Sequence, residues 1–125
     1  MFKDTKAFSG FSVNDIDAAQ KFYGETLGVD VEKQPEGLAL HIAGGNDIFV
    51  YPKPDHEPAT FTILNFKVAD IDKAVSELKD KGIKFEEYDM PNLKTGEDGI
   101  FRDGGMAIAW FKDPAGNILS VLKEK

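Results

Sequence analysis

The side chains able to carry out chemistry are few in this chain of 125 residues. It has no cysteine, which removes thiolate nucleophiles, disulfides and cysteine-based zinc sites. Its two histidines, His41 and His56, have side chains whose charge changes near neutral pH. We expect His41 to be a partly exposed strand residue, with a lone general base as the alternative, and we expect His56 to face solvent.

One tryptophan, Trp110, and one arginine, Arg102, are the other distinctive side chains. Trp110 lies in an apolar run typical of a strand, where a core position and ligand stacking are both open. Arg102 follows Phe101 in a long loop that contains glycine. Loops of this length often close over ligands, so an anion contact is the alternative to a plain surface position. Neither a serine–histidine–aspartate pattern nor calcium-loop spacing is visible.

The charge balance excludes some classes of partner. The formal net charge is −7, with only one arginine, and nucleic-acid binding needs a basic face. An acidic chain favours a cationic ligand, although solubility alone also explains the charge. No apolar run approaches the roughly 20 residues that a membrane span needs, and the first residues lack the apolar stretch of a signal peptide. We therefore expect a soluble, cytoplasmic protein.

A short phrase occurs twice and organises the chain. FSVNDID at residues 11–17 is echoed by FKVADID at residues 66–72. Each phrase reads as the end of a strand followed by the start of a helix, with Asp15 and Asp70 as helix N-caps. Glycines at positions 28 and 82 are placed to end the two helices. The phrase is therefore a structural corner, and we assign no catalytic role to its aspartates.

The same order of elements is predicted for both halves of the chain. Each half contains a strand, a helix and three further strands, which predicts an α+β fold. The predicted strands cover residues 8–13, 29–33, 38–42 and 47–51, and then 60–68, 83–87, 106–112 and 118–122. A loop is expected from 88 to 105. We expect one domain, residues 1–125, made of two βαβββ modules (about 1–52 and 59–125) with a proline-containing joint at 52–58.

Two longer stretches carry a resemblance to a known family. FSVNDIDAAQKFYGETLG at residues 11–28 and FKDPAGNILSVL at residues 111–122 resemble phrases of the vicinal oxygen chelate superfamily. That superfamily includes glyoxalases, bleomycin-resistance proteins and dioxygenases. The resemblance covers nearly the whole chain and implies a curled mixed sheet that encloses a cleft. Because one fold of this kind serves many chemistries, it says little about function.

The resemblance also implies where a metal site would lie. The four metal-ligand positions of the family's enzymes correspond here to Phe8, Val50, Ile63 and Ser120. None of these is a metal ligand of the usual type, whereas a divalent metal needs several imidazole or carboxylate donors. The sequence therefore predicts no metal and no cofactor, and it disfavours metal-dependent catalysis.

The cleft that the resemblance implies is mainly apolar with a few polar points. Strand alternation predicts that it is lined by Phe8, Ser12, Val50, Ile63, Asn65, Lys67, Trp110 and Ser120. As alternatives, Lys67 lies at the sheet edge in solvent, and Asn65 and Ser120 only satisfy neighbouring backbone.

The leading functional hypothesis is metal-free binding of a small organic ligand, cationic or aromatic, as in bleomycin-resistance-like sequestration. The alternative is a glyoxalase- or dioxygenase-like lyase or oxidoreductase with a non-standard metal site, and a third possibility is a structural or regulatory module. The resemblance implies a homodimer. It leaves open whether the modules pair within one chain or between two.

Overall fold

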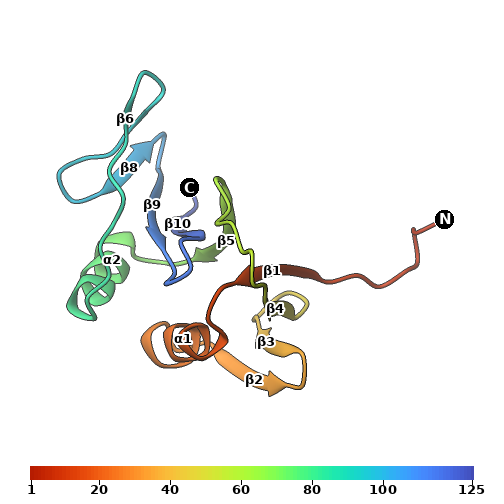
Figure 1. Cartoon of the computed structure of the whole chain (residues 1–125). Helices are drawn as coiled ribbons and strands as arrows, with labels where there is room; N and C mark the ends of the chain where they lie inside the picture. The colour runs from red at the N-terminus through yellow and green to blue at the C-terminus, as the bar shows by residue number, and fades with distance from the viewer. The chain divides into compact units, whose positions relative to one another are not determined.

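The computed structural model describes all residues, 1–125. The chain divides into two compact units, residues 1–58 and residues 59–125, which are described separately (Figure 1). Each unit contains a four-stranded mixed sheet and a helical segment, so the fold is of the α+β class, as predicted. None of the helices has the length and apolar character required to span a membrane.

Unit 1 follows the predicted order of elements. They are β1 (Ser9–Val13), α1 (Ile16–Lys21), the π-helical turn η1 (Phe22–Thr26), β2 (Asp30–Gln34), β3 (Gly37–His41) and β4 (Ile48–Pro52). The strand order in the sheet is β1-β4-β3-β2. The first and last strands, β1 and β4, pair in parallel, and the other pairs are antiparallel.

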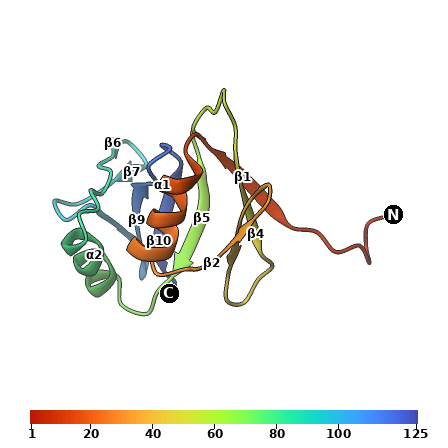
Figure 2. The same cartoon turned by 60° about the horizontal axis from the view of Figure 1, so that its bottom comes forward.

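Unit 2 repeats this topology with an insertion. Its elements are β5 (Thr62–Lys67), α2 (Ile71–Asp80), β6 (Asp89–Met90), β7 (Leu93–Lys94), β8 (Ile100–Asp103), β9 (Met106–Lys112) and β10 (Ile118–Lys123). The main sheet has the order β5-β10-β9-β8, and β6 and β7 form a separate two-stranded ribbon (Figure 2). The parallel pair is again the first and last strand.

Both predicted helix starts are confirmed. The carboxylate of Asp15 accepts hydrogen bonds from the backbone N–H groups of Asp17 and Ala18, and that of Asp70 accepts one from Lys73. These bonds satisfy N–H groups that have no partner within the helix. The repeated phrase is thus a strand-to-helix corner in both units.

The first helix widens where two aromatic residues follow one another. Leu27 N donates to Phe22 O over 2.9 Å, which closes a π-type turn before Gly28, whose φ is +72°. Phe22 and Tyr23 are both buried, and their rings meet edge to face at 5.2 Å. A turn wider than an α-turn lets both neighbours face the core, since consecutive residues of a regular helix diverge.

The prediction of a strand over residues 83–87 is wrong. Only Phe85 makes an isolated bridge there, to Phe111 of β9. The edge position of the sheet belongs instead to β8, from the segment predicted as loop, which pairs with residues 106–109 of β9. Because β8 already occupies that edge, residues 83–87 reach β9 only at its far end, where Glu86 N donates to Trp110 O.

Candidate functional site

The sheet of unit 1 has one face against its helix and one face turned away from it. On the helix face, the ring of Phe11 lies 5.8 Å from that of Tyr23, and Val13 is fully buried. α1 packs against β3 and β4. We call the other face the open face of unit 1, and by strand pairing it comprises Gly10, Ser12, Glu32, Gln34, Ala39, His41, Phe49 and Tyr51.

The register of β4 reverses one prediction. Val50 pairs with Phe11 and is fully buried, so it lies on the helix face and not on the face predicted to line a cleft. Its neighbours Phe49 and Tyr51 take the open-face positions, and their rings stack at 5.9 Å with planes 18° apart. Cross-strand partners share a face, and the sequence of β4 alone does not fix its partners.

The two histidines both contact side chains on the open face of unit 1. His56 was predicted to face solvent, but its Nδ1 lies 2.7 Å from Ser12 Oγ and the residue is half-buried. His41 is a partly exposed strand residue, as expected. Its Nδ1 lies 2.8 Å from Asp47 Oδ1, and its Nε2 lies 3.2 Å from Glu32 Oε1. The bond to Asp47 raises the pKa of His41, desolvation opposes this, and Glu32 adds to the increase.

A small pocket lies beside this histidine. It has a volume of about 230 Å³ and is lined by Phe8, Gln34, Ala39, Asp47, Ile48 and Phe49. Phe8, predicted as a cleft residue, contributes a ring that is 72% exposed. The structure therefore places Phe8 at the mouth of a pocket that ends at the carboxylate held by His41.

The sheet of unit 2 shows the same division of faces. Its helix face is the core of the unit and includes the buried residues Ala107, Ala109, Phe111, Leu119 and Val121. α2 packs against β9 and β10. We call the other face the open face of unit 2, and by strand pairing it comprises Thr62, Asn65, Lys67, Phe101, Ile108, Trp110, Ser120 and Leu122.

Trp110 is the centre of an aromatic group on the open face of unit 2. Its indole Nε1 donates to Thr62 Oγ1 over 3.1 Å, which fixes the orientation of the ring. The ring of Tyr88 meets it edge to face at 5.3 Å, and that of Phe101 lies at 6.4 Å. Burial raises the pKa of the Tyr88 hydroxyl, so this side chain stays neutral.

The polar residues predicted for the cleft lie beside this group. Ser120 is fully buried and donates its hydroxyl hydrogen bond to Asn65 Oδ1, so the two satisfy each other. Lys67 is exposed and its Nζ lies 3.4 Å from Glu124 Oε1. Ser120, Asn65 and Trp110 are thus brought together on neighbouring strands, whereas Lys67 lies toward the end of the face.

An irregularity in β5 changes the expected role of Ile63. Thr62 pairs with Ile118 and Leu64 pairs with Leu119, so Ile63 is an extra residue in the ladder. The open-face position that simple alternation assigns to Ile63 is held by Thr62, the partner of Trp110. A bulge of this kind shifts every side chain on one side of it relative to strict alternation.

The lone arginine has a structural position. Arg102 Nη2 lies 2.9 Å from Asp72 Oδ1 of α2, and Nη1 lies 3.2 Å from Asp98 Oδ2. The contact with Asp72 ties β8 to α2, and the contact with Asp98 ties it to the segment just before β8. Because both terminal nitrogens already form ion pairs with carboxylates, Arg102 is a surface residue that connects neighbouring elements and is not placed to bind an anion.

The residues present do not fit the metal site of the family's enzymes. No group of three or more His, Asp or Glu side chains is placed to hold a metal ion. His41 comes closest, but each of its ring nitrogens is engaged by a carboxylate. The register of β4 offers Phe49 and Tyr51 in place of Val50, and neither supplies a carboxylate.

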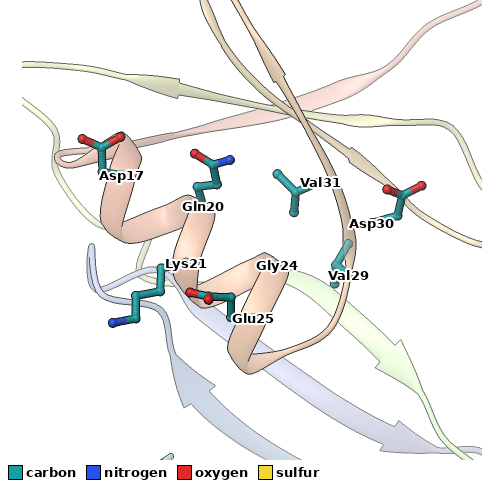
Figure 3. A pocket seen from close by; sticks show the side chains of 8 residues that line it. All are labelled: Asp17, Gln20, Lys21, Gly24, Glu25, Val29, Asp30 and Val31. Carbon is teal, nitrogen blue, oxygen red and sulfur yellow. The ribbon is translucent and has the colours of Figure 1, made fainter.

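A larger groove lies between the first helix and β2. It has a volume of about 480 Å³, and its lining includes Gln20, Gly24, Val29 and Val31. Figure 3 shows Gln20 and Val31 on opposite sides of the groove, while the acidic and basic side chains lie around its rim. No buried polar atom in the structure lacks a partner, so this groove presents no desolvated donor or acceptor to a ligand.

Sequence reasoning missed several of these residues. Phe49 and Tyr51 are not among the residues predicted to line the cleft, and Tyr88 lies in the segment predicted as a loop. The paired carboxylates Glu32 and Asp47 lie nine and six residues from His41 and carry no motif. The pairing of β2 with β3 brings Glu32 to His41, and the pairing of β3 with β4 brings Asp47, which directly precedes β4, to the same side chain.

Comparisons with known proteins agree with this architecture. The family model described as Glyoxalase/Bleomycin resistance protein/Dioxygenase superfamily matches residues 8–121. A glyoxalase family protein from Enterococcus faecalis is similar over 98% of this chain and 99% of its own, with 21% identity and a TM-score of 0.69. No protein among the curated ones compared with the chain matches it.

Two further solved structures have names that state a role. The antibiotic-binding protein TnmS3 from Streptomyces sp. CB03234 has a TM-score of 0.64 and 21% identity, with 98% of each chain covered. The fosfomycin resistance protein FosX from Listeria monocytogenes has a TM-score of 0.72 and 11% identity, with 98% of this chain and 94% of its own covered. At these identities the similarity shows the fold alone.

Proposed function

The chain belongs to the Glyoxalase/Bleomycin resistance protein/Dioxygenase superfamily, and from that premise we propose that it binds a small organic molecule without a metal ion. Members of this superfamily with the same fold include an antibiotic-binding protein. The candidate binding surfaces in this proposal are the open face of unit 1 and the open face of unit 2, each taken by itself. Of the residues predicted from sequence, they retain Phe8, Ser12, Asn65, Lys67, Trp110 and Ser120.

The observation that carries the proposal is the aromatic group around Trp110. Three rings from β8, β9 and the segment before β6 gather on a face that the helix of the unit does not cover. Aromatic side chains that are held in one orientation provide contact area at a low cost in conformational entropy. The neighbouring Ser120–Asn65 pair adds a polar point for orientation.

The experiment uses the single tryptophan as the reporter. A panel of neutral, cationic and anionic aromatic compounds is titrated into protein treated with a chelator, while Trp110 emission and the melting temperature are recorded. We expect at least one compound to change the emission saturably and to raise the melting temperature, because binding to the native state alone stabilises it. The affinity should be unchanged when divalent metal is restored.

Two variants locate the binding surface. Phe101→Ala removes a ring beside Trp110 and should weaken binding about tenfold. Phe61→Ala removes an exposed ring outside the group and should leave the affinity unchanged. If no compound in the panel alters the emission or the melting temperature, the proposal fails and a structural or regulatory module takes its place.

One observation favours the alternative of an enzyme with a non-standard metal site. His41 lies beside two carboxylates, so it is the place where a lyase or oxidoreductase would have to bind a metal, although these side chains are not arranged to hold one. Metal analysis of the purified protein decides between the two. A stoichiometric divalent metal that is lost in His41→Gln would replace the binding proposal with an enzyme, whereas metal-free protein that binds the panel compound supports it.

The homodimer and the cytoplasmic location stay predictions. The family resemblance supports a homodimer, and analytical ultracentrifugation should give twice the chain mass of 13.8 kDa. Fractionation of the producing cells tests the location. A single-chain mass at working concentration contradicts the dimer without affecting ligand binding by either open face.

A further inference from the structure

The pocket on the open face of unit 1 combines two features that suit a positively charged ligand. Its walls include the rings of Phe8 and Phe49 and the methyl group of Ala39. Its polar end is the carboxylate of Asp47, with the amide of Gln34 also on the wall. Aromatic faces carry negative charge density, so they attract cations, and a carboxylate does so more strongly.

Asp47 is held by a contact with His41, which does not line the pocket. Its Oδ1 bonds to His41 Nδ1, and His41 Nε2 is in turn held by Glu32 Oε1. Gln34 Nε2 reaches Glu32 Oε2 over 3.5 Å. The contacts run from Gln34 through Glu32 and His41 to Asp47, so the Asp47 carboxylate that lines the pocket is bonded through its Oδ1.

The charge of this cluster is negative in either state of His41. Three carboxylates, those of Asp30, Glu32 and Asp47, surround the imidazole. With one negative charge on each of the three carboxylates, the cluster has a formal charge of −2 when the imidazole is protonated and −3 when it is neutral. An anionic ligand would therefore be repelled, and a neutral ligand would gain nothing from the cluster.

We propose that the pocket formed by Phe8, Ala39, Asp47 and Phe49 binds the alkylated ammonium group of a small organic cation. This inference deepens the proposed function and rests on it, because it names the chemical class of the ligand. The pocket volume of about 230 Å³ accommodates an ammonium head with its alkyl substituents, and the attached body extends past Phe8. The ammonium group faces the Asp47 carboxylate and packs against the two rings.

The test compares three probes that share a benzyl or phenyl ring and differ in charge: benzyltrimethylammonium, benzyl alcohol and benzoate. Backbone amide signals are followed by NMR during each titration. We expect benzyltrimethylammonium to shift the amides of residues 8, 39 and 47–49, with an affinity about fivefold above that of benzyl alcohol. Benzoate should bind more weakly than the alcohol.

Matched variants separate the pocket from the general negative field of the protein. Asp47→Asn should weaken the binding of benzyltrimethylammonium about fivefold. Asp55→Asn, which removes a paired carboxylate outside the pocket, should leave this affinity unchanged. Phe8→Ala should weaken the same probe about threefold, and Phe61→Ala should not. Both phenylalanines are exposed, so neither variant threatens folding.

The outcomes distinguish the ligand class from the binding function. Equal affinity for the cation and the alcohol overturns the cation pocket. So does an equal loss of affinity for the cation in Asp47→Asn and Asp55→Asn. In either case, a saturable change of Trp110 emission with any compound still upholds the proposed function. Failure of every compound to perturb either Trp110 or any amide overturns both. Cation binding at residues 8 and 47–49 with silent Trp110 supports this pocket and restricts the binding surface to unit 1.

Discussion

The two sheets share one topology but achieve their packing differently. In unit 1, two strands contain glycine, and at Gly10 and Gly37 an added Cβ would lie only 2.8 Å and 2.1 Å from backbone oxygens of β4. The four main strands of unit 2 contain no glycine, and rings such as Phe111 and Phe85 fill the space beneath the sheet. The same strand order therefore allows glycines to bring strand backbones close together in unit 1 and allows aromatic rings to pack beneath the sheet in unit 2.

The open faces differ in the same way. That of unit 1 carries a line of charged and polar side chains from Gln34 to Asp47, with one aromatic stack beside it. That of unit 2 carries the rings around Trp110 and the hydrogen bond from the buried Ser120 to the exposed Asn65. The same topology therefore presents a face with charged and polar side chains in unit 1 and a face with an aromatic group in unit 2.

The largest effect is expected in the aromatic core of unit 2. Phe111 is fully buried and meets Phe85 at 5.6 Å, so Phe111→Ala should lower the free energy of unfolding by about 3–5 kcal/mol. Urea denaturation followed by circular dichroism measures it. The adjacent Ile108→Ala on the open face is the control, and an equal loss there would show that the two faces do not differ in packing.

A somewhat smaller loss is expected from the backbone approach in unit 1. In Gly37→Ala the new methyl group meets the carbonyl oxygen of Val50, and we expect a loss of about 3 kcal/mol. Gly24→Ala provides the contrast, because its Cβ would lie 3.6 Å from Val31 and the substitution should stabilise by about 0.5–1 kcal/mol. Equal melting temperatures for the two variants would contradict the close approach of β3 to β4.

A modest effect is expected from the ion pairs of Arg102 in unit 2. Arg102→Ala removes contacts to Asp72 and Asp98 that are exposed to solvent, so the expected loss is about 0.5–1 kcal/mol. The difference in melting temperature between the native protein and Arg102→Ala should be present at low salt and should vanish at about 1 M salt, since salt screens exposed pairs. A loss that persists at high salt would show that packing of the arginine side chain, and not its charge, ties β8 to α2.

The smallest effect is the pH dependence of unit 1. The pKa of His41 is raised above its ordinary value of 6.5 on folding, mainly by Asp47. Its contribution to stability is therefore complete below pH 6.5 and is lost as the pH rises through the raised pKa. Melting temperatures of the native protein should fall across this window relative to those of His41→Gln. If the melting temperatures of the two proteins changed with pH in the same way, a stabilising ion pair of protonated His41 with Asp47 would be contradicted.

Local sequence signals predicted the elements well where side chains bond to nearby backbone. The caps at Asp15 and Asp70 are of this kind, because their partners lie within three residues, and the glycine after each helix is a local signal through its positive φ. The strand over 83–87 failed because competition for the edge of β9 is decided by a segment further along the chain. That competition leaves no trace in the local pattern.

The candidate site was predicted less completely, for a related reason. Alternation states which residues share a face but not which face it is, and Val50 shows the consequence. One extra residue at Ile63 is enough to move Thr62 into the position that counting assigned to its neighbour. Ser120 lies opposite Trp110 of β9 and opposite Asn65 of β5, beyond the irregularity at Ile63, and a role of the three in ligand binding stays a prediction.

The π turn at Phe22–Thr26 has a consequence for changes in chain length. A turn closed from Leu27 to Phe22 contains one more residue than an α-turn, so it holds a single-residue insertion without moving the helix start at Asp15 or the glycine at position 28. Deletion of Gly24 should therefore restore a regular helix instead of breaking the fold. The segment between the repeated corner and the second strand can therefore shorten by one residue while the sheet stays in register.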